Sequence, residues 1–102
     1  MIRVDVSEAG GVVVLVVDGE IDIANAPLMR AALEGLDPTE VVLMDLADVR
    51  FMDSSGLDVL VDQSTRMRQA GGHLKIRNPS VAVRRVVEIT GFQQLLFASD
   101  GR

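Results

Sequence analysis

The sequence predicts one α/β domain over residues 1–102, with a mixed, mostly parallel sheet of four to five strands and helices packed on it. A chain of 102 residues has the size of one domain with one core. Its hydrophobic fraction of 48% is too high for a disordered chain. Short runs of β-branched residues alternate with segments of helical periodicity. Such alternation is typical of a largely parallel sheet.

The N-terminal part predicts two strands joined by a tight turn, followed by a helix. Residues 2–6 alternate between apolar and charged, as in a half-buried strand. Residues 8–11 end in two glycines and predict a hairpin turn. The apolar run 12–17 predicts a central strand covered on both faces. Residues 26–36 predict a helix with Asn25 as its N-cap. The expected inward stripe of this helix is Leu28, Met29, Ala32, Leu33 and Leu36.

The middle of the chain predicts a buried strand and a long helix. Residues 41–46 form the next apolar run. Helical spacing then extends over residues 56–69, and the glycine pair 71–72 is expected to end the helix. The expected inward face of this helix is Leu57, Leu60, Val61, Ser64 and Met67.

The C-terminal part predicts a strand, a helix and a last short strand. Residues 73–77 alternate as a strand, and a third helix is expected to follow residues 78–80 and to end near residue 91. Residues 94–97 are interpreted as a last strand, and residues 99–102 are expected to be frayed.

The composition excludes several functions. A net charge of −5 disfavours binding to nucleic acid. No apolar run has the roughly 20 residues of a membrane span, and the N-terminus lacks the layout of a signal peptide, so we expect a cytoplasmic protein without a membrane partner. Because the chain has one histidine, His73, and no cysteine, we expect neither a metal site nor a cofactor.

The most informative segment lies between the strand 41–46 and the helix that follows it. It ends in Asp53-Ser54-Ser55-Gly56, where Asp and Ser are preferred N-cap residues. Ser55 and Asp58 also have the spacing of a capping box. Helix capping could therefore explain the whole segment.

The alternative interpretation is a phosphorylation switch. A serine at a helix N-terminus lies beside free backbone N–H groups, which can donate hydrogen bonds to an added phosphate. Phosphorylation would add roughly −1.5 to −2 charges beside Asp53 and Asp58. A docking partner would sense the change without any active site. The residues alone do not distinguish Ser54 from Ser55 as the acceptor.

The chain resembles the bacterial anti-sigma factor antagonists, the single-domain members of the STAS family. The specific match is Phe51-Met52-Asp53-Ser54-Ser55-Gly56-Leu57. Further matches are residues 19–22, 26–27, 71–72 and 90–92, so the resemblance covers nearly the whole chain. Asp58 departs from the pattern, because many members carry a small residue there.

The resemblance implies a partner switch. The unphosphorylated form would bind an anti-sigma factor that is also a serine kinase, and so release a sigma factor. The kinase would phosphorylate Ser55, the serine before the glycine, and a PP2C-type phosphatase would reverse the reaction. The expected partner-binding residues around Ser55 are Asp22, Asp53, Ser54, Gly56, Leu57 and Asp58.

Three other functions make different demands on the sequence. A phosphoacceptor receiver domain would need paired acids after the first strand and a late lysine, but that strand offers only Asp5 and the sole lysine is Lys75. A catalytic role is disfavoured because the chain has no glycine-rich phosphate loop. A non-switching STAS scaffold, in which the two serines only cap the helix, stays open.

Overall fold

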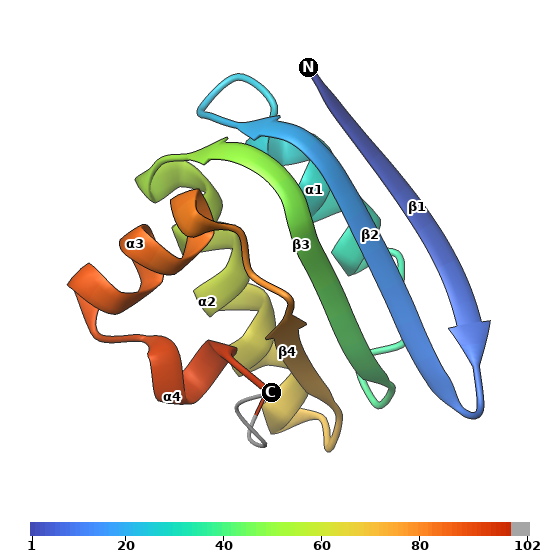
Figure 1. The fold of residues 1–102 in the computed structure, drawn as a ribbon. Helices are drawn as coiled ribbons and strands as arrows, with labels where there is room; N and C mark the ends of the chain where they lie inside the picture. The colour runs from blue at the N-terminus through green and yellow to red at the C-terminus, as the bar shows by residue number, and fades with distance from the viewer. Residues whose placement is uncertain (99–102) are drawn as a thin grey trace.

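The computed structural model describes residues 1–98 and contains one four-stranded sheet (Figure 1). The strands lie in chain order: β1 (Ile2–Ala9), β2 (Val12–Ile21), β3 (Val41–Met52) and β4 (His73–Arg77). β1 pairs antiparallel with β2, whereas β2, β3 and β4 are parallel. The predicted mixed, mostly parallel sheet is therefore confirmed.

The helices cover one face of the sheet. They are α1 (Ala26–Glu34), α2 (Ser54–Gln69), α3 (Val81–Thr90) and α4 (Gln93–Leu96), and α2 contacts the other three (Figure 1). Alternate residues of β2, such as Leu15 and Val17, are fully buried, whereas Val14 and Val16 are only half-buried. The prediction that residues 12–17 are covered on both faces is wrong, because a run of valines looks the same whether one or both faces are packed.

The hairpin is confirmed, but three strands are longer than predicted: those expected over residues 2–6, 12–17 and 41–46 extend to residues 9, 21 and 52. The turn between β1 and β2 consists of Gly10 and Gly11, with φ of 60° and 81°. Positive φ at both central residues is what a two-residue type I′ turn requires. The ladder between β1 and β2 runs without a register shift from Ile2↔Gly19 to Ala9↔Val12.

The predicted last strand is wrong. Residues 93–96 form α4, and Leu96 is fully buried. Only Phe97 makes a strand-like contact, an isolated parallel bridge to Ile76, and the Ala98 N–H donates to the Ile76 carbonyl at 2.9 Å. The helical turn of α4 places the Leu96 side chain in the core. The frayed end expected at residues 99–102 lies outside the described residues.

Two details of α1 also differ from expectation. Leu28 is 61% exposed, so it does not belong to the inward stripe, whereas Met29 and Leu33 are fully buried. The Asn25 side chain does not cap the helix. Its Nδ2 instead donates to the Glu20 carbonyl at 2.6 Å. The local turn at the end of β2 therefore competes successfully for the side chain expected to cap the helix.

Within residues 1–98, none of the helices has the length and apolarity needed to cross a membrane.

Candidate functional site

The candidate site lies where β2 and β3 end, side by side. The parallel register pairs Ile21 with Met52, the last residues of these strands. One residue further, the Asp53 N–H donates to the Ile21 carbonyl at 3.2 Å. The register therefore places Asp22 next to Asp53, although the two residues are far apart in the sequence. Helix α2 begins immediately after Asp53 (Figure 1).

Asp53 is the N-cap of α2. Its backbone is extended, with φ −105° and ψ −172°, and its Oδ1 accepts a hydrogen bond from the Ser55 N–H at 2.9 Å. Its carbonyl accepts from the N–H groups of Gly56 and Leu57 at 3.2 and 3.3 Å. The expected Ser55–Asp58 capping box is therefore wrong, because Ser55 already lies inside the helix.

The two serines present hydroxyl groups that the fold does not use for capping. Ser54 is exposed and Ser55 is half-buried, and both belong to the first turn of α2. Neither hydroxyl makes a hydrogen bond among the residues that the structure describes. The interpretation that these serines only cap the helix therefore loses its physical basis.

Asp22 holds the turn that leads from β2 to α1. Its Oδ1 accepts from the N–H groups of Ala24 and Asn25, both at 3.0 Å. In return, Asn25 Oδ1 accepts from the Asp22 N–H at 2.9 Å. These hydrogen bonds engage Oδ1 of Asp22 and hold its side chain at the C-terminal end of β2. Proximity to Asp53 follows from the sheet register, which sequence spacing alone did not predict.

Gly56 and Leu57 lie in the interior beneath the serines. Leu57 is 4% exposed, and Gly56 is buried against Ile21 and Met52. The Leu57 side chain therefore has little surface to offer a partner. These two residues instead fix the start of α2 against the end of β2, and so determine where Ser54 and Ser55 lie.

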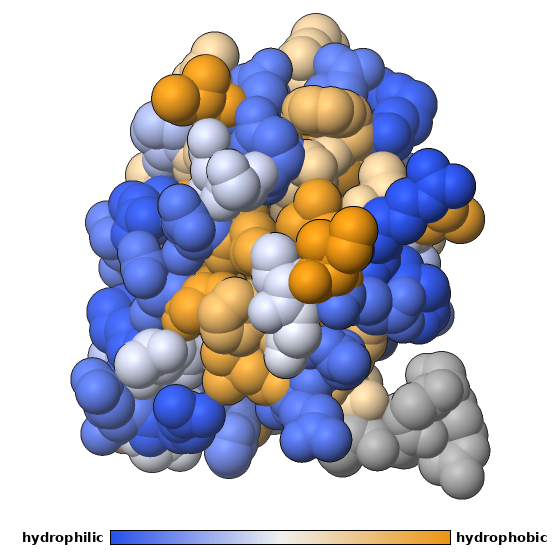
Figure 2. All heavy atoms as spheres, turned by 90° about the vertical axis from the view of Figure 1, so that its left-hand side faces the viewer, coloured by the Kyte–Doolittle hydropathy of each residue, from blue (hydrophilic) through white to orange (hydrophobic). Residues whose placement is uncertain are grey.

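The surface around the serines combines acidic groups with exposed apolar side chains. Asp58, one turn into α2, is exposed. Ile23, directly after Asp22, is 79% exposed, and Phe51, at the end of β3, is 48% exposed. Sequence reasoning missed Ile23, for which the only signal was an isoleucine in a polar turn. Figure 2 shows that apolar side chains also gather on the helical side of the molecule, between charged groups.

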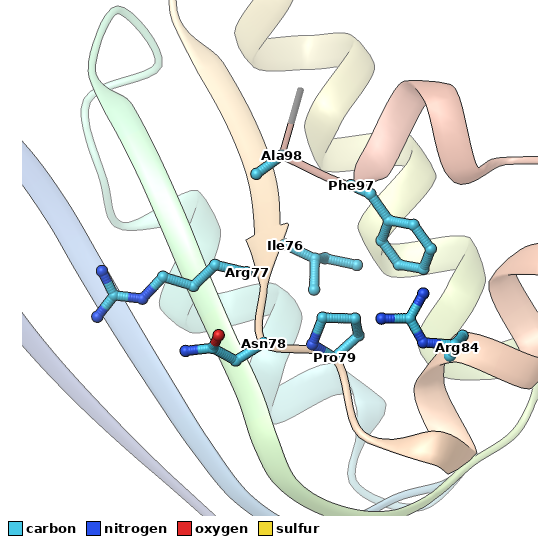
Figure 3. A pocket seen from close by; sticks show the side chains of 7 residues that line it. All are labelled: Ile76, Arg77, Asn78, Pro79, Arg84, Phe97 and Ala98. Atoms are coloured by element: carbon cyan, nitrogen blue, oxygen red, sulfur yellow. The ribbon is translucent and has the colours of Figure 1, made fainter. Parts of the chain in front are cut away.

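A cavity lies elsewhere, at the end of β4 and the start of α3 (Figure 3). It has a volume of about 170 Å³ and is lined by Ile76, Pro79, Arg84 and Phe97, among others. The Arg84 guanidinium lies 5.4 Å from the centroid of the Phe97 ring. This volume is below the several hundred Å³ typical of small-molecule sites. Within the described residues, no cluster of three or more His, Cys, Asp or Glu could hold a metal ion.

The fold and this serine-bearing helix start define a STAS domain. The chain belongs to the STAS domain family, whose model matches residues 3–100. The chain is 35% identical over 96 residues to the anti-sigma-B factor antagonist of Bacillus subtilis, covering 93% of this chain and 88% of the relative.

Solved structures agree with this assignment. An anti-sigma factor antagonist from Mycobacterium paratuberculosis superposes with a TM-score of 0.79 at 29% identity, covering 94% of this chain and 83% of the other. The anti-sigma factor antagonist SpoIIAA in its unphosphorylated form has a TM-score of 0.72 at 20% identity, covering 96% and 90%. At that identity the second likeness supports the fold alone.

Proposed function

We propose that this chain is an anti-sigma factor antagonist that a serine kinase controls. Its unphosphorylated form binds an anti-sigma factor that is also the kinase, and a sigma factor is thereby released. Phosphorylation of Ser55 ends the binding, and a PP2C-type phosphatase restores it. The protein acts in the cytoplasm by binding proteins, without catalysis, cofactor or contact with nucleic acid. The names of its relatives support the partner class.

The observation that carries the proposal is that Asp53, and not a serine, caps the start of α2. Because Asp53 supplies the cap, the Ser55 hydroxyl is not needed for capping and is available for phosphorylation. The same cap holds the first turn of α2 in place. A kinase needs such a hydroxyl at the surface, and Ser55 is half-buried rather than enclosed. The resemblance to the family selects Ser55 over the more exposed Ser54.

Electrostatics support release of the partner rather than unfolding of the domain. A phosphate on Ser55 adds roughly −1.5 to −2 charges, and the helix N-terminus stabilises it by only about 0.3–1 kcal/mol. Asp53 and Asp22 lie at the same sheet edge and repel it. A penalty of about 1.4 kcal/mol at an interface lowers the affinity tenfold.

The neighbouring residues have distinct roles in this proposal. Asp22 and Asp53 shape the surface that the kinase contacts, with Ser54 and Asp58 at its exposed rim. Gly56 and Leu57 contribute by fixing the first turn of α2, since both are buried.

The experiment combines phosphorylation with binding. The chain is incubated with ATP and candidate anti-sigma kinases, and intact-mass spectrometry with peptide mapping locates any phosphate; one phosphate on Ser55 is expected. Calorimetric titration with the same kinase should show that Ser55→Ala binds like the parent and that Ser55→Asp binds at least about tenfold more weakly. Ser54→Asp is the matched control and should have a smaller effect.

Two outcomes contradict the proposal. Equal affinities of Ser55→Ala and Ser55→Asp, with no phosphate on a chain that binds stably, would indicate a non-switching STAS scaffold. A phosphate on Ser54 alone would keep the mechanism but transfer the acceptor role to the neighbouring residue.

A further inference from the structure

The outer edge of β1 has no neighbour within residues 1–98. The strand order places β1 at one end of the sheet, and it makes its main contacts with β2 alone (Figure 1). At the other end, β4 carries Lys75 and is bridged by Phe97. Edge strands are usually protected by charged side chains, especially lysine, by proline, by bulges or by a covering element. β1 has no lysine or proline and no register shift against β2, and two of its charged residues, Arg3 and Asp5, have opposite signs.

The hydrogen-bond pattern shows which backbone groups of β1 face outward. The Glu20 N–H donates to the Met1 carbonyl at 3.1 Å, one step beyond the Ile2↔Gly19 pair. The turn bond likewise joins Ala9 and Val12, since a β-turn links its first and fourth residues. Because successive residues alternate in an antiparallel ladder, the odd residues of β1 bond to β2. The N–H and C=O groups of Ile2, Val4 and Val6 therefore point away from the sheet.

The side chains of β1 are complementary to those of a second, antiparallel β1 strand. In an antiparallel pair centred on Val4, Val4 lies opposite Val4 of a second copy, and Ile2 lies opposite Val6. Arg3 then lies opposite Asp5 of the second copy, and Asp5 opposite its Arg3. The outward-facing groups fall in the hydrogen-bonded pairs, while Arg3 and Asp5 fall in the closer, non-hydrogen-bonded pairs where side chains meet.

Burial and charge agree with this register. Val6 is 54% exposed, although its side chain lies on the face of the sheet that carries the core, because Val6 pairs with the buried Leu15. Pairing would cover it with Ile2 of the second copy. Within the described residues, the ion pairs of Arg3 and Asp5 are exposed: Nε of Arg3 lies 3.4 Å from Oδ2 of Asp5, and Nη2 of Arg3 lies 3.8 Å from Oδ2 of Asp18. Both side chains can therefore turn to a second copy at little cost.

We propose that the β1 edge is a self-association surface whose partner is a second copy of this chain. Two copies pair β1 with β1 around a two-fold axis at Val4 and form one continuous eight-stranded sheet. The inference does not depend on the proposed function. Because the two β1 strands run in opposite directions, the α2 starts of the two copies lie at opposite ends of the joint sheet. Ser55 stays accessible in both.

The test uses charge exchange in the full chain, with sedimentation equilibrium as the readout. Arg3→Glu places acid opposite acid, and Asp5→Arg places base opposite base. Each variant is expected to dimerise at least about tenfold more weakly than the parent, since like charges directly opposite each other destabilise a strand pair. An equimolar mixture of the two variants restores both attractive pairs, so it should form a heterodimer as strong as the parent dimer.

Glu8→Arg is the matched control, because Glu8 lies on the same strand but outside the residues 2–6 that pair in this register. This variant should dimerise like the parent. Circular dichroism checks that the variants fold, which is expected since the Arg3 and Asp5 side chains are 71% and 66% exposed. Hydrogen exchange should show protection of the Val4 and Val6 N–H groups that grows with protein concentration.

Three results overturn the proposal. The first is a parent chain that stays monomeric up to about 1 mM, a concentration at which even weak specific pairs are populated. The second is a dimer that neither charge substitution weakens, which would place the interface on another surface. The third is a mixture of the two variants that stays monomeric. None of these results bears on phosphorylation of Ser55.

Discussion

Replacing Gly56 by alanine is expected to destabilise the fold, although alanine favours helices. A Cβ at this position would lie 2.6 Å from Cγ2 of Ile21 and 2.8 Å from Cγ of Met52. The methionine can move, but Ile21 is fully buried and β-branched, so its side chain has almost no other rotamer to adopt. The first turn of α2 must then shift away from the end of β2.

The size of the effect follows from two opposing contributions. Overpacking a core costs about 1–3 kcal/mol, and exchanging glycine for alanine within a helix returns up to about 1 kcal/mol. We expect a net loss of about 1–2 kcal/mol in the free energy of unfolding. For a domain of this size, each kcal/mol lowers the Tm by about 4–8 °C.

Urea and thermal denaturation of the parent, Gly56→Ala and Gly35→Ala provide the measurement. Gly35 is the matched control, since a Cβ there would lie 3.5 Å from its nearest neighbour, the Ala31 carbonyl oxygen, and its φ is −74°. Gly35→Ala should leave stability unchanged or raise it slightly. If Gly56→Ala were as stable as Gly35→Ala, the close packing of α2 on Ile21 would not limit this position, and the reasoning would be refuted.

Two further predictions concern the helix start and the corrected face of α1. Asp53→Ala should lower the free energy of unfolding by about 0.5–2 kcal/mol, because it removes the side-chain cap on the Ser55 N–H. Asp53→Asn should retain most of the stability in urea denaturation, since asparagine can also cap a helix. An equal loss in both variants would show that the charge of Asp53, and not its cap, stabilises the domain. Met29→Ala should cost about 2–5 kcal/mol, whereas Leu28→Ala should change the stability by less than about 0.5 kcal/mol, since only Met29 is buried. Similar losses of stability for Met29→Ala and Leu28→Ala in the same assay would show that Leu28 also packs in the core.

Local chemistry predicted most of the elements. The alternation over residues 2–6, the glycine pair at 10–11 and the stop at 71–72 each act through the backbone of a few neighbours, so the sequence contains the necessary information. Ser80 also behaves as its position suggests, since its hydroxyl oxygen accepts from the Val83 N–H at 3.2 Å. Such features do not depend on what packs around them.

The predictions failed at positions where tertiary packing, and not local sequence, determines the structure. A run of valines does not show how many faces of β2 are covered. Residues 93–96 form a helical turn that buries Leu96, and Phe97 has the extended backbone expected of the predicted strand. At the candidate site, the serine motif was visible in the sequence. The sequence pattern alone does not show which residue caps α2, because Asp and Ser both favour that position. The backbone of Asp53 decides between them.

The geometry at the start of α2 also explains how a phosphate could change binding without changing the fold. The cap on α2 comes from Asp53, the turn at the end of β2 is closed by Asp22 and Asn25, and the packing beneath comes from Gly56. None of these contacts uses the Ser55 hydroxyl. Modifying it therefore removes no bond that holds the domain together, and the added charge acts on whatever protein docks at this surface. On the proposed function, phosphorylated and unphosphorylated chains should have nearly the same stability and very different affinities for the kinase.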